Sequence, residues 1–203
     1  EELKWTDAKD LSIIFSETEN DPPIILDDLN VTLHAEKLFV VGMDPIKGEI
    51  WSTEMLVDLD EVTHAPPTPW TSTLSIKSDD PNIPDPIEIS SPRIEMDSNG
   101  NAHIIWSQSI SSPSDGISIN YSRWDGSKLS PSVELFKNTQ NESYYQYDLF
   151  TDLENNLHTA WVSGSDGGIF YSKAASDSAG SSSGWLPAQQ ITEPGPTSSP
   201  EIG

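Results

Sequence analysis

Short apolar runs separated by turn signals recur along the chain. In the stretch 90–135 these runs alternate with polar residues or are briefly continuous, as expected for strands of a partly buried sheet. Asn99-Gly100 and Asp125-Gly126 each follow one of the runs, and such pairs supply the positive φ angles that tight hairpins need. The pattern predicts one unit of four antiparallel strands. Its strands are expected at 92–97, 102–108, 117–123 and 131–135.

The same unit returns further along the chain without a gap. Residues 152–161 repeat 97–106, so that His103 and His158 occupy the same position in the two copies. A weaker copy lies within 37–76. Repeats of this kind, each built from short strands, indicate a β-propeller or a related stacked array.

The repeat divides the chain into blades and predicts a single all-β domain. Ser198–Ile202 matches Ser90–Ile94, so a new unit begins near residue 198. Broken units would expose unpaired strand edges, so we expect either an excerpt of a larger propeller or a piece that another chain completes. The expected units are a last strand and loop in 1–23, four-stranded blades in 24–84, 85–140 and 141–196, and a first strand in 197–203.

One sequence order carries a family resemblance. It runs Pro-x-Ile-x-x-Asp-x-x-Gly-Asn-x-His-x-x-Trp over 92–106, then Tyr-Ser-Arg or Tyr-Ser-Lys, then a strand led by tryptophan. This order resembles the bacterial neuraminidase repeats of the sialidase superfamily, whose fold is a β-propeller. The resemblance covers roughly residues 24–202 and is best over 90–196. The family's Asp-box, Ser-x-Asp-x-Gly-x-Thr-Trp, is degraded here to Ser122–Leu129, with the aspartate displaced by one position.

The resemblance sets a chemical requirement for sialidase activity. A sialidase site needs three arginines around the substrate carboxylate, because guanidinium groups bind carboxylates through two parallel hydrogen bonds. It also needs a tyrosine–glutamate nucleophile pair and an aspartic acid. The chain has two arginines, Arg93 and Arg123, so it cannot build that triad alone, and we assign it no catalytic residue. The enzymatic alternative is part of a sialidase-like glycoside hydrolase whose other catalytic residues lie outside this chain.

Charge and composition restrict the partners. The formal net charge of −23 argues against binding of nucleic acid or of an anionic membrane surface. No apolar run reaches membrane-spanning length, so we expect no membrane insertion. Without cysteine the chain has neither disulfides nor thiolate chemistry. Such an acidic segment suits an extracellular or cell-surface protein.

Aromatic residues outside the repeated pattern are the candidate ligand-binding residues. Three tyrosines and an aspartate stand within 144–148, at the entry to an expected innermost strand, which in a propeller lies near the axial mouth. Such residues can stack on sugar rings and bind hydroxyl groups; alternatively, they fill a gap against a neighbouring blade. Trp124 is added as an aromatic residue that we expect to be exposed in a turn. The full set is Tyr144, Tyr145, Tyr147, Asp148, Arg93 and Trp124.

The repeated histidines and aromatic residues have a structural interpretation. His103 and His158 are expected to hydrogen-bond between blades, and the repeated aromatic residues to pack between them. Those aromatic residues are Trp51, Trp106, Trp161, Tyr121 and Tyr171.

Calcium is the one cofactor that the sequence suggests. Hard carboxylate oxygens are plentiful in the long connections between the expected strands. The candidate calcium ligands are Asp58, Asp60, Glu61, Asp79 and Asp80.

The leading functional hypothesis is a non-catalytic recognition module at the cell surface or outside the cell. It would bind a glycan or a protein through the axial mouth and the long acidic loops, within a larger protein or assembly. A structural alternative is a subunit of a surface filament or ring, in which exposed strand edges join neighbouring copies.

Overall fold

The computed structural model of the protein describes residues 26–35, 37–44, 49–56, 72–76, 88–109, 116–138, 146–163 and 168–192. In these residues every regular element is a β-strand except one short 3-10 turn, η1 (Ser182–Gly184). The all-β prediction is therefore confirmed. No helix in the described part of the chain is long and apolar enough to cross a membrane.

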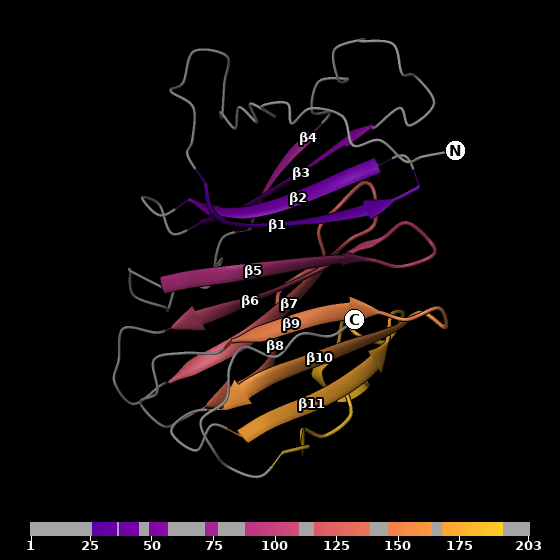
Figure 1. Ribbon diagram of the computed structural model, residues 1–203. Helices are drawn as coiled ribbons and strands as arrows, with labels where there is room; N and C mark the ends of the chain where they lie inside the picture. The colour runs from indigo at the N-terminus through magenta and orange to yellow at the C-terminus, as the bar shows by residue number, and fades with distance from the viewer. Residues whose placement is uncertain are drawn as a thin grey trace, which may run out of the picture.

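The strands form three antiparallel sheets, and each sheet is a meander of four strands that follow one another in the chain (Figure 1). Within the described ranges the sheets do not close into a barrel or a propeller. The first sheet contains β1 (Asp27–His34), β2 (Lys37–Asp44), β3 (Glu49–Leu56) and β4 (Ser72–Ile76). The second contains β5 (Glu88–Met96), β6 (Ala102–Ser109), β7 (Ile117–Trp124) and β8 (Val133–Asn138). The third contains β9 (Tyr147–Thr151), β10 (Asn156–Ser163), β11 (Gly168–Ala175) and β12 (Gln189–Gln190).

The two predicted turn pairs lie in the loops between β5 and β6 and between β7 and β8. Gly100 and Gly126 have positive φ angles of 81° and 88°, as expected, but Asn99 and Asp125 do not. Only the glycine of each pair therefore supplies the predicted positive φ angle. Each loop is instead held by an aspartate side chain that accepts backbone hydrogen bonds, for example from Asn99 and Asn101 to Asp97.

Two apolar clusters hold the three sheets together. The first lies between the first and second sheets and includes Val41, Ile50, Ile104 and Trp106. The second lies between the second and third sheets, where Phe136 stacks on Trp161 with ring centroids 4.3 Å apart. The prediction that repeated aromatic residues pack between sheets is confirmed for Trp106, Tyr121 and Trp161. At about 25 cal/mol per Å² of buried apolar surface, these clusters are the main source of stability.

The first strands of the three sheets lie side by side. β1 contacts β5 and β5 contacts β9, and the three run in the same direction (Figure 1). Hydrogen bonds join them: Asn30 Oδ1 accepts from the Ile94 amide at 2.9 Å, and the Tyr147 hydroxyl donates to the Ser91 carbonyl at 2.5 Å. These three strands are called the inner strands below.

A second polar link joins the loops of the second and third sheets. Asn155 Oδ1 accepts from the Ser98 amide at 2.8 Å, and Asn155 Nδ2 donates to Ser98 Oγ at 2.6 Å. Asn155 has a φ of 62°, and it stands where the preceding repeat has Gly100. Glycine adopts this left-handed conformation readily, and asparagine is one of the few residues with a side chain that tolerate it.

Two substitutions of Asn155 separate the contribution of its hydrogen bonds to stability from that of its backbone conformation. Asn155→Gly keeps the positive φ angle but removes both links to Ser98, and we expect the free energy of unfolding to fall by about 1 kcal/mol. Asn155→Ala also forces alanine into the left-handed region, which costs roughly a further 1 kcal/mol. Chemical denaturation of the three proteins measures both steps. Equal stability of the alanine and glycine variants would contradict the second step.

Candidate functional site

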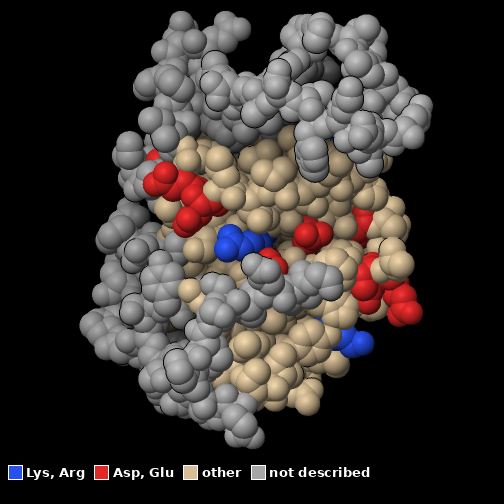
Figure 2. Space-filling model, in the orientation of Figure 1, with Lys and Arg blue, Asp and Glu red and all other residues tan. Residues whose placement is uncertain are grey.

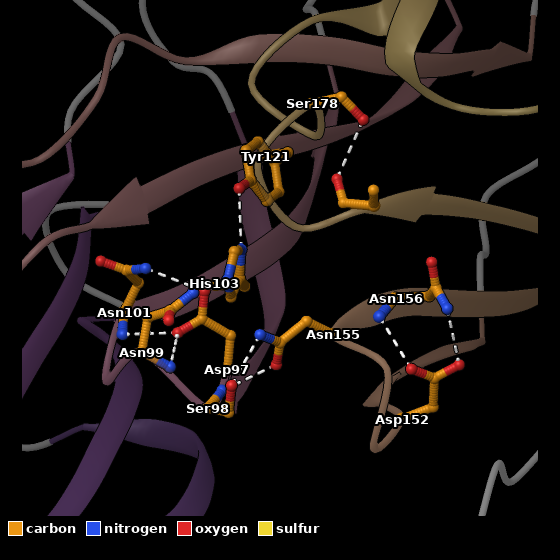
Figure 3. Close-up of polar contacts among 11 residues, drawn as sticks. Asp97, Ser98, Asn99, Asn101, His103, Tyr121, Asp152, Asn155, Asn156 and Ser178 are labelled. Atoms are coloured by element: carbon orange, nitrogen blue, oxygen red, sulfur yellow. Dashed lines mark hydrogen bonds and ion pairs between the residues drawn. The ribbon is translucent and has the colours of Figure 1, made fainter.

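The loop between β5 and β6 is built around one buried carboxylate. Asp97 Oδ1 accepts from the amides of Asn99 and Asn101, both at 2.9 Å, and Oδ2 accepts from Asn101 Nδ2 at 2.8 Å (Figure 3). His103 Nε2 lies 3.3 Å from Oδ2, and its Nδ1 lies 2.8 Å from the hydroxyl oxygen of Tyr121. Aspartate, histidine and tyrosine are all fully buried. A ligand therefore does not reach them.

The third sheet repeats this arrangement. Asp152 accepts from the amides of Glu154 and Asn156 at 2.8 Å and from Asn156 Nδ2 at 2.9 Å. His158 Nε2 lies 2.8 Å from Asp152 Oδ2, and Nδ1 lies 2.6 Å from the hydroxyl of Tyr171. Each histidine thus bonds within its own sheet. The prediction that His103 and His158 hydrogen-bond between blades is wrong, because both histidines are used to lock their own hairpin.

The protonation of the buried group follows from its surroundings. Burial by itself would raise the pKa of Asp97, but hydrogen bonds from Asn101 and His103 outweigh it and lower that pKa. Burial lowers the pKa of His103. The aspartate is therefore ionised and the histidine neutral at pH 7. Because a carboxylate only accepts, the histidine proton lies on Nε2, and Nδ1 accepts from the Tyr121 hydroxyl.

A different set of charged residues lies on the inner strands, next to an irregularity in β5. The pairing of β5 with β6 shifts register between Ser90 and Arg93, and Ser91 there has a φ of 53°. Such bulges re-aim the side chains that follow them. Arg93 is the first residue of β5 in regular pairing after this shift.

The Arg93 guanidinium joins β5 to β9. Its Nη1 donates to the Pro92 carbonyl at 2.9 Å, and its Nε lies 3.9 Å from Asp148 Oδ1. Its central carbon lies 5.9 Å from the centroid of the Tyr147 ring, which supports the guanidinium plane. The arginine and aspartate side chains are 30% and 28% exposed, so both remain accessible to a ligand. The structure therefore brings together three of the residues predicted for ligand binding.

Glu95 belongs to the same group, and the sequence analysis missed it. Glu95 lies two residues after Arg93 on β5, and because side chains alternate along a strand, both lie on the same side of the sheet. Glu95 is half-buried. Burial and, after it, the negative charge of Asp148 raise the pKa of Glu95 to about 7, although the Met96 amide opposes the shift. The two-residue alternation of a strand could have identified Glu95 from the sequence, because it places this residue on the same side as the candidate Arg93. Arg93, Glu95 and Asp148 are called the inner-strand site below.

Basic and acidic groups lie close together on one face of the molecule. In the view of Figure 2 a basic group lies near the middle of the face, with acidic groups close on both sides. Uncharged residues make up most of the described surface around it. Alternating donors and acceptors on a largely uncharged face are suited to a polar, hydroxyl-bearing ligand.

The other predicted site residues have different surroundings. Tyr147 is buried and donates its hydroxyl to the Ser91 carbonyl, which agrees with the gap-filling alternative and leaves no open ring face for a sugar. Trp124 is 8% exposed and packs in the first cluster, so the expectation of an exposed aromatic residue there is wrong. The remaining candidates, Tyr144, Tyr145, Asp58, Asp60, Glu61, Asp79 and Asp80, lie outside the described residues.

No cluster of three or more histidine, aspartate or glutamate side chains suited to a metal ion occurs among the residues that the structure describes. A scan against models of known protein families found no match, and neither did a search of curated protein sequences. The family resemblance therefore stays a prediction that rests on the repeated residues themselves.

The buried carboxylate generates a prediction about stability and pH. Asp97→Asn turns one acceptor oxygen into an amide that meets the donors of Asn101 and His103, so we expect a loss of roughly 2 kcal/mol at pH 7. Because the folded pKa of Asp97 lies below its unfolded value, its charge stabilises the fold above about pH 4 and less as the pH falls below that. The difference between variant and wild type should therefore shrink at pH 3 in urea denaturation.

Asp125→Asn is the matched control for this experiment. Asp125 Oδ1 accepts from the amides of Ser127 and Lys128 on the surface, and an asparagine oxygen can accept the same two bonds. We expect its stability at pH 7 to stay closer to wild type than that of Asp97→Asn. An equal loss of stability in the two variants would mean that burial of Asp97 does not increase the contribution of its carboxylate to stability.

Proposed function

We propose that the protein is a non-catalytic recognition module that binds a glycan at the inner-strand site. The observation that carries the proposal is the partly exposed Arg93, held over the Tyr147 ring and beside Asp148 on the neighbouring inner strand. Arginine supplies several donors in a fixed plane, and the two carboxyl groups supply acceptors around it. Sugars present closely spaced hydroxyl groups that need both.

The repeat supports a propeller as the framework for this site. Three four-stranded meanders stack through apolar faces, and their first strands lie side by side in one direction. In a propeller of the sialidase type, the first strand of each blade lines the central axis. We propose that the three sheets are consecutive blades of such a propeller and that the inner-strand site lies at its axial mouth.

The charge of the chain favours an uncharged sugar. A chain with a formal net charge of −23 repels anionic ligands at long range, and Arg93 already has Asp148 as a partner. With two arginines in the whole sequence, the three-arginine clamp of a sialidase is not available from this chain. The proposed module acts outside the cell or at its surface, where neutral glycans are abundant partners.

Removing the guanidinium tests the proposed function. Binding to a panel of galactose-, mannose- and glucose-terminated oligosaccharides, with sialylated versions beside them, identifies the best glycan for the wild-type protein. Arg93→Ala should weaken the binding of that glycan roughly 10- to 100-fold, because hydrogen bonds to a charged group are lost. Lys137→Ala, which removes the same charge from exposed β8, should bind like wild type. An equal loss of affinity in both variants would mean that only the net charge matters and would contradict a specific role of Arg93.

Self-assembly is a second candidate function, and exposed apolar residues at the two ends of the stack favour it. On β1, Leu29, Val31 and Leu33 are each more than half exposed. At the other end, Tyr171 is partly exposed, whereas Tyr121, its counterpart in the second sheet, is fully buried under the third sheet. A second copy of the chain would continue this sheet-on-sheet interface by packing its first sheet on the third sheet.

Light scattering separates the two candidates. If copies assemble, the mass exceeds 22.3 kDa, and it grows with salt because screening weakens the repulsion between acidic chains. Val31→Glu places a charge on the exposed stripe without touching the core, so it should return the protein to the monomer mass. A wild-type protein that is monomeric at 0.1 M and at about 1 M salt would eliminate self-assembly through these faces.

A further inference from the structure

We propose that Glu95 acts in the inner-strand site as a neutral carboxylic acid that donates a hydrogen bond to the glycan, so that a proton is taken up on binding. This inference rests on the proposed function and adds to it the residue that sets the donor pattern of the site. It also predicts in which pH range the site works.

The position of Glu95 on β5 gives it access to the ligand of Arg93. In the pairing of β5 with β6, Arg93 lies opposite Ile105 and Glu95 lies opposite His103. Ile105 belongs to the cluster between the second and third sheets, whereas Ile94, between the two charged residues, packs toward the first sheet. Arg93 and Glu95 therefore share the side of β5 that faces β9 and Asp148.

No ion pair joins Glu95 to a cation among the residues that the structure describes. On β5 itself, Arg93 is engaged with the Pro92 carbonyl and with Asp148. Across on β6, His103 is neutral and its two nitrogens face Asp97 and Tyr121. On β9, Asp148 is a negative charge, which opposes ionisation of a second carboxyl nearby.

The first sheet adds one negative charge to these surroundings, because Asp28 on β1 acts electrostatically on Tyr147, the ring beneath Arg93. Its strands pack against the opposite side of β5, through Ile94 and Met96. The lysine described on these strands, Lys37 on β2, pairs with Glu54 on β3 at 3.3 Å. Among the described residues, Arg93 on β5 and Arg123 on β7 share this face of the second sheet, since Arg123 lies opposite His103 and His103 lies opposite Glu95. Arg123 is two strands away from Glu95, and Arg93 already contacts Asp148, so an ionised Glu95 would compete with Asp148 for Arg93.

Protonation resolves this competition. Burial and Asp148 hold the pKa of Glu95 near 7, so a proton is gained or lost within the physiological range. In the protonated state Glu95 and Arg93 both donate, and Asp148 accepts. In the ionised state the site has two acceptors and one donor, with an added negative charge on a half-buried group. The protonated state matches a glycan oxygen that lies between Arg93 and Glu95.

The expected pH dependence has a definite sign. When one protonated group is required for binding, affinity is highest below the pKa of that group and falls about tenfold for each pH unit above it. The wild-type dissociation constant for its best neutral oligosaccharide should therefore rise roughly 100-fold between pH 6 and pH 9. Calorimetry in buffers of different ionisation enthalpy should detect uptake of about one proton at pH 8.

Glu95→Gln isolates the role of the proton. The amide is a neutral donor at every pH, so this variant should bind the same oligosaccharide with nearly constant affinity from pH 6 to pH 9 and without proton uptake. Glu95→Ala removes the donor and should bind more weakly than Glu95→Gln at all pH values. Glu134→Gln makes the same chemical change on exposed β8 and should keep the wild-type pH dependence.

Each outcome separates this inference from the proposed function. A wild-type affinity that is equal at pH 6 and pH 9 would overturn the role of Glu95 while leaving glycan recognition by Arg93 intact. Absence of glycan binding at pH 6 would overturn both. A titration of the Glu95 carboxyl followed by NMR in the free protein gives a readout without ligand: a midpoint near pH 4 contradicts the inference, and one near pH 7 supports it.

Discussion

A single carboxylate organises each hairpin on which the rest of the second and third sheets depends; it is fully buried at Asp97 and 28% exposed at Asp152. Asp97 and Asp152 accept hydrogen bonds from amides that their loops would otherwise leave unpaired. Each also faces a histidine on the following strand, and that histidine bonds a tyrosine on the strand after it. An unpaired buried polar group costs about as much as a lost hydrogen bond, so this network holds the loop and three of the four strands together.

The fixed hairpins in turn set how the sheets meet. Because the loops keep one shape, Ser98 and Asn155 can face each other across the gap between sheets, and the apolar faces behind them pack over Trp161. The inner strands are then held close enough for Tyr147 to reach the Ser91 carbonyl. The accessible charge pair between Arg93 and Asp148 follows from that approach.

The sequence predicted what repeats and missed what depends on neighbours. Strand order, the four-stranded units and the packing of Trp106 and Trp161 follow from periodicity, which is a local property. Exposure of Trp124 was predicted wrongly, because its place next to a turn gives no information about the first sheet that buries it. The histidine partners were also wrong, since a match between repeats indicates equivalent positions but does not say which contacts lie within a sheet.

The inner-strand site lies at positions where the repeats differ. Arg93 and Asp148 occupy the same position in successive repeats, four residues before the loop aspartate. Glu95 corresponds in the same way to Phe150. Core and hairpin positions must stay similar because every sheet makes the same contacts, so opposite charges at equivalent positions are not required by the fold. A half-buried acid and a partly exposed arginine cost desolvation energy that an apolar pair would avoid. The proposed binding of a glycan gives a physical reason for this cost.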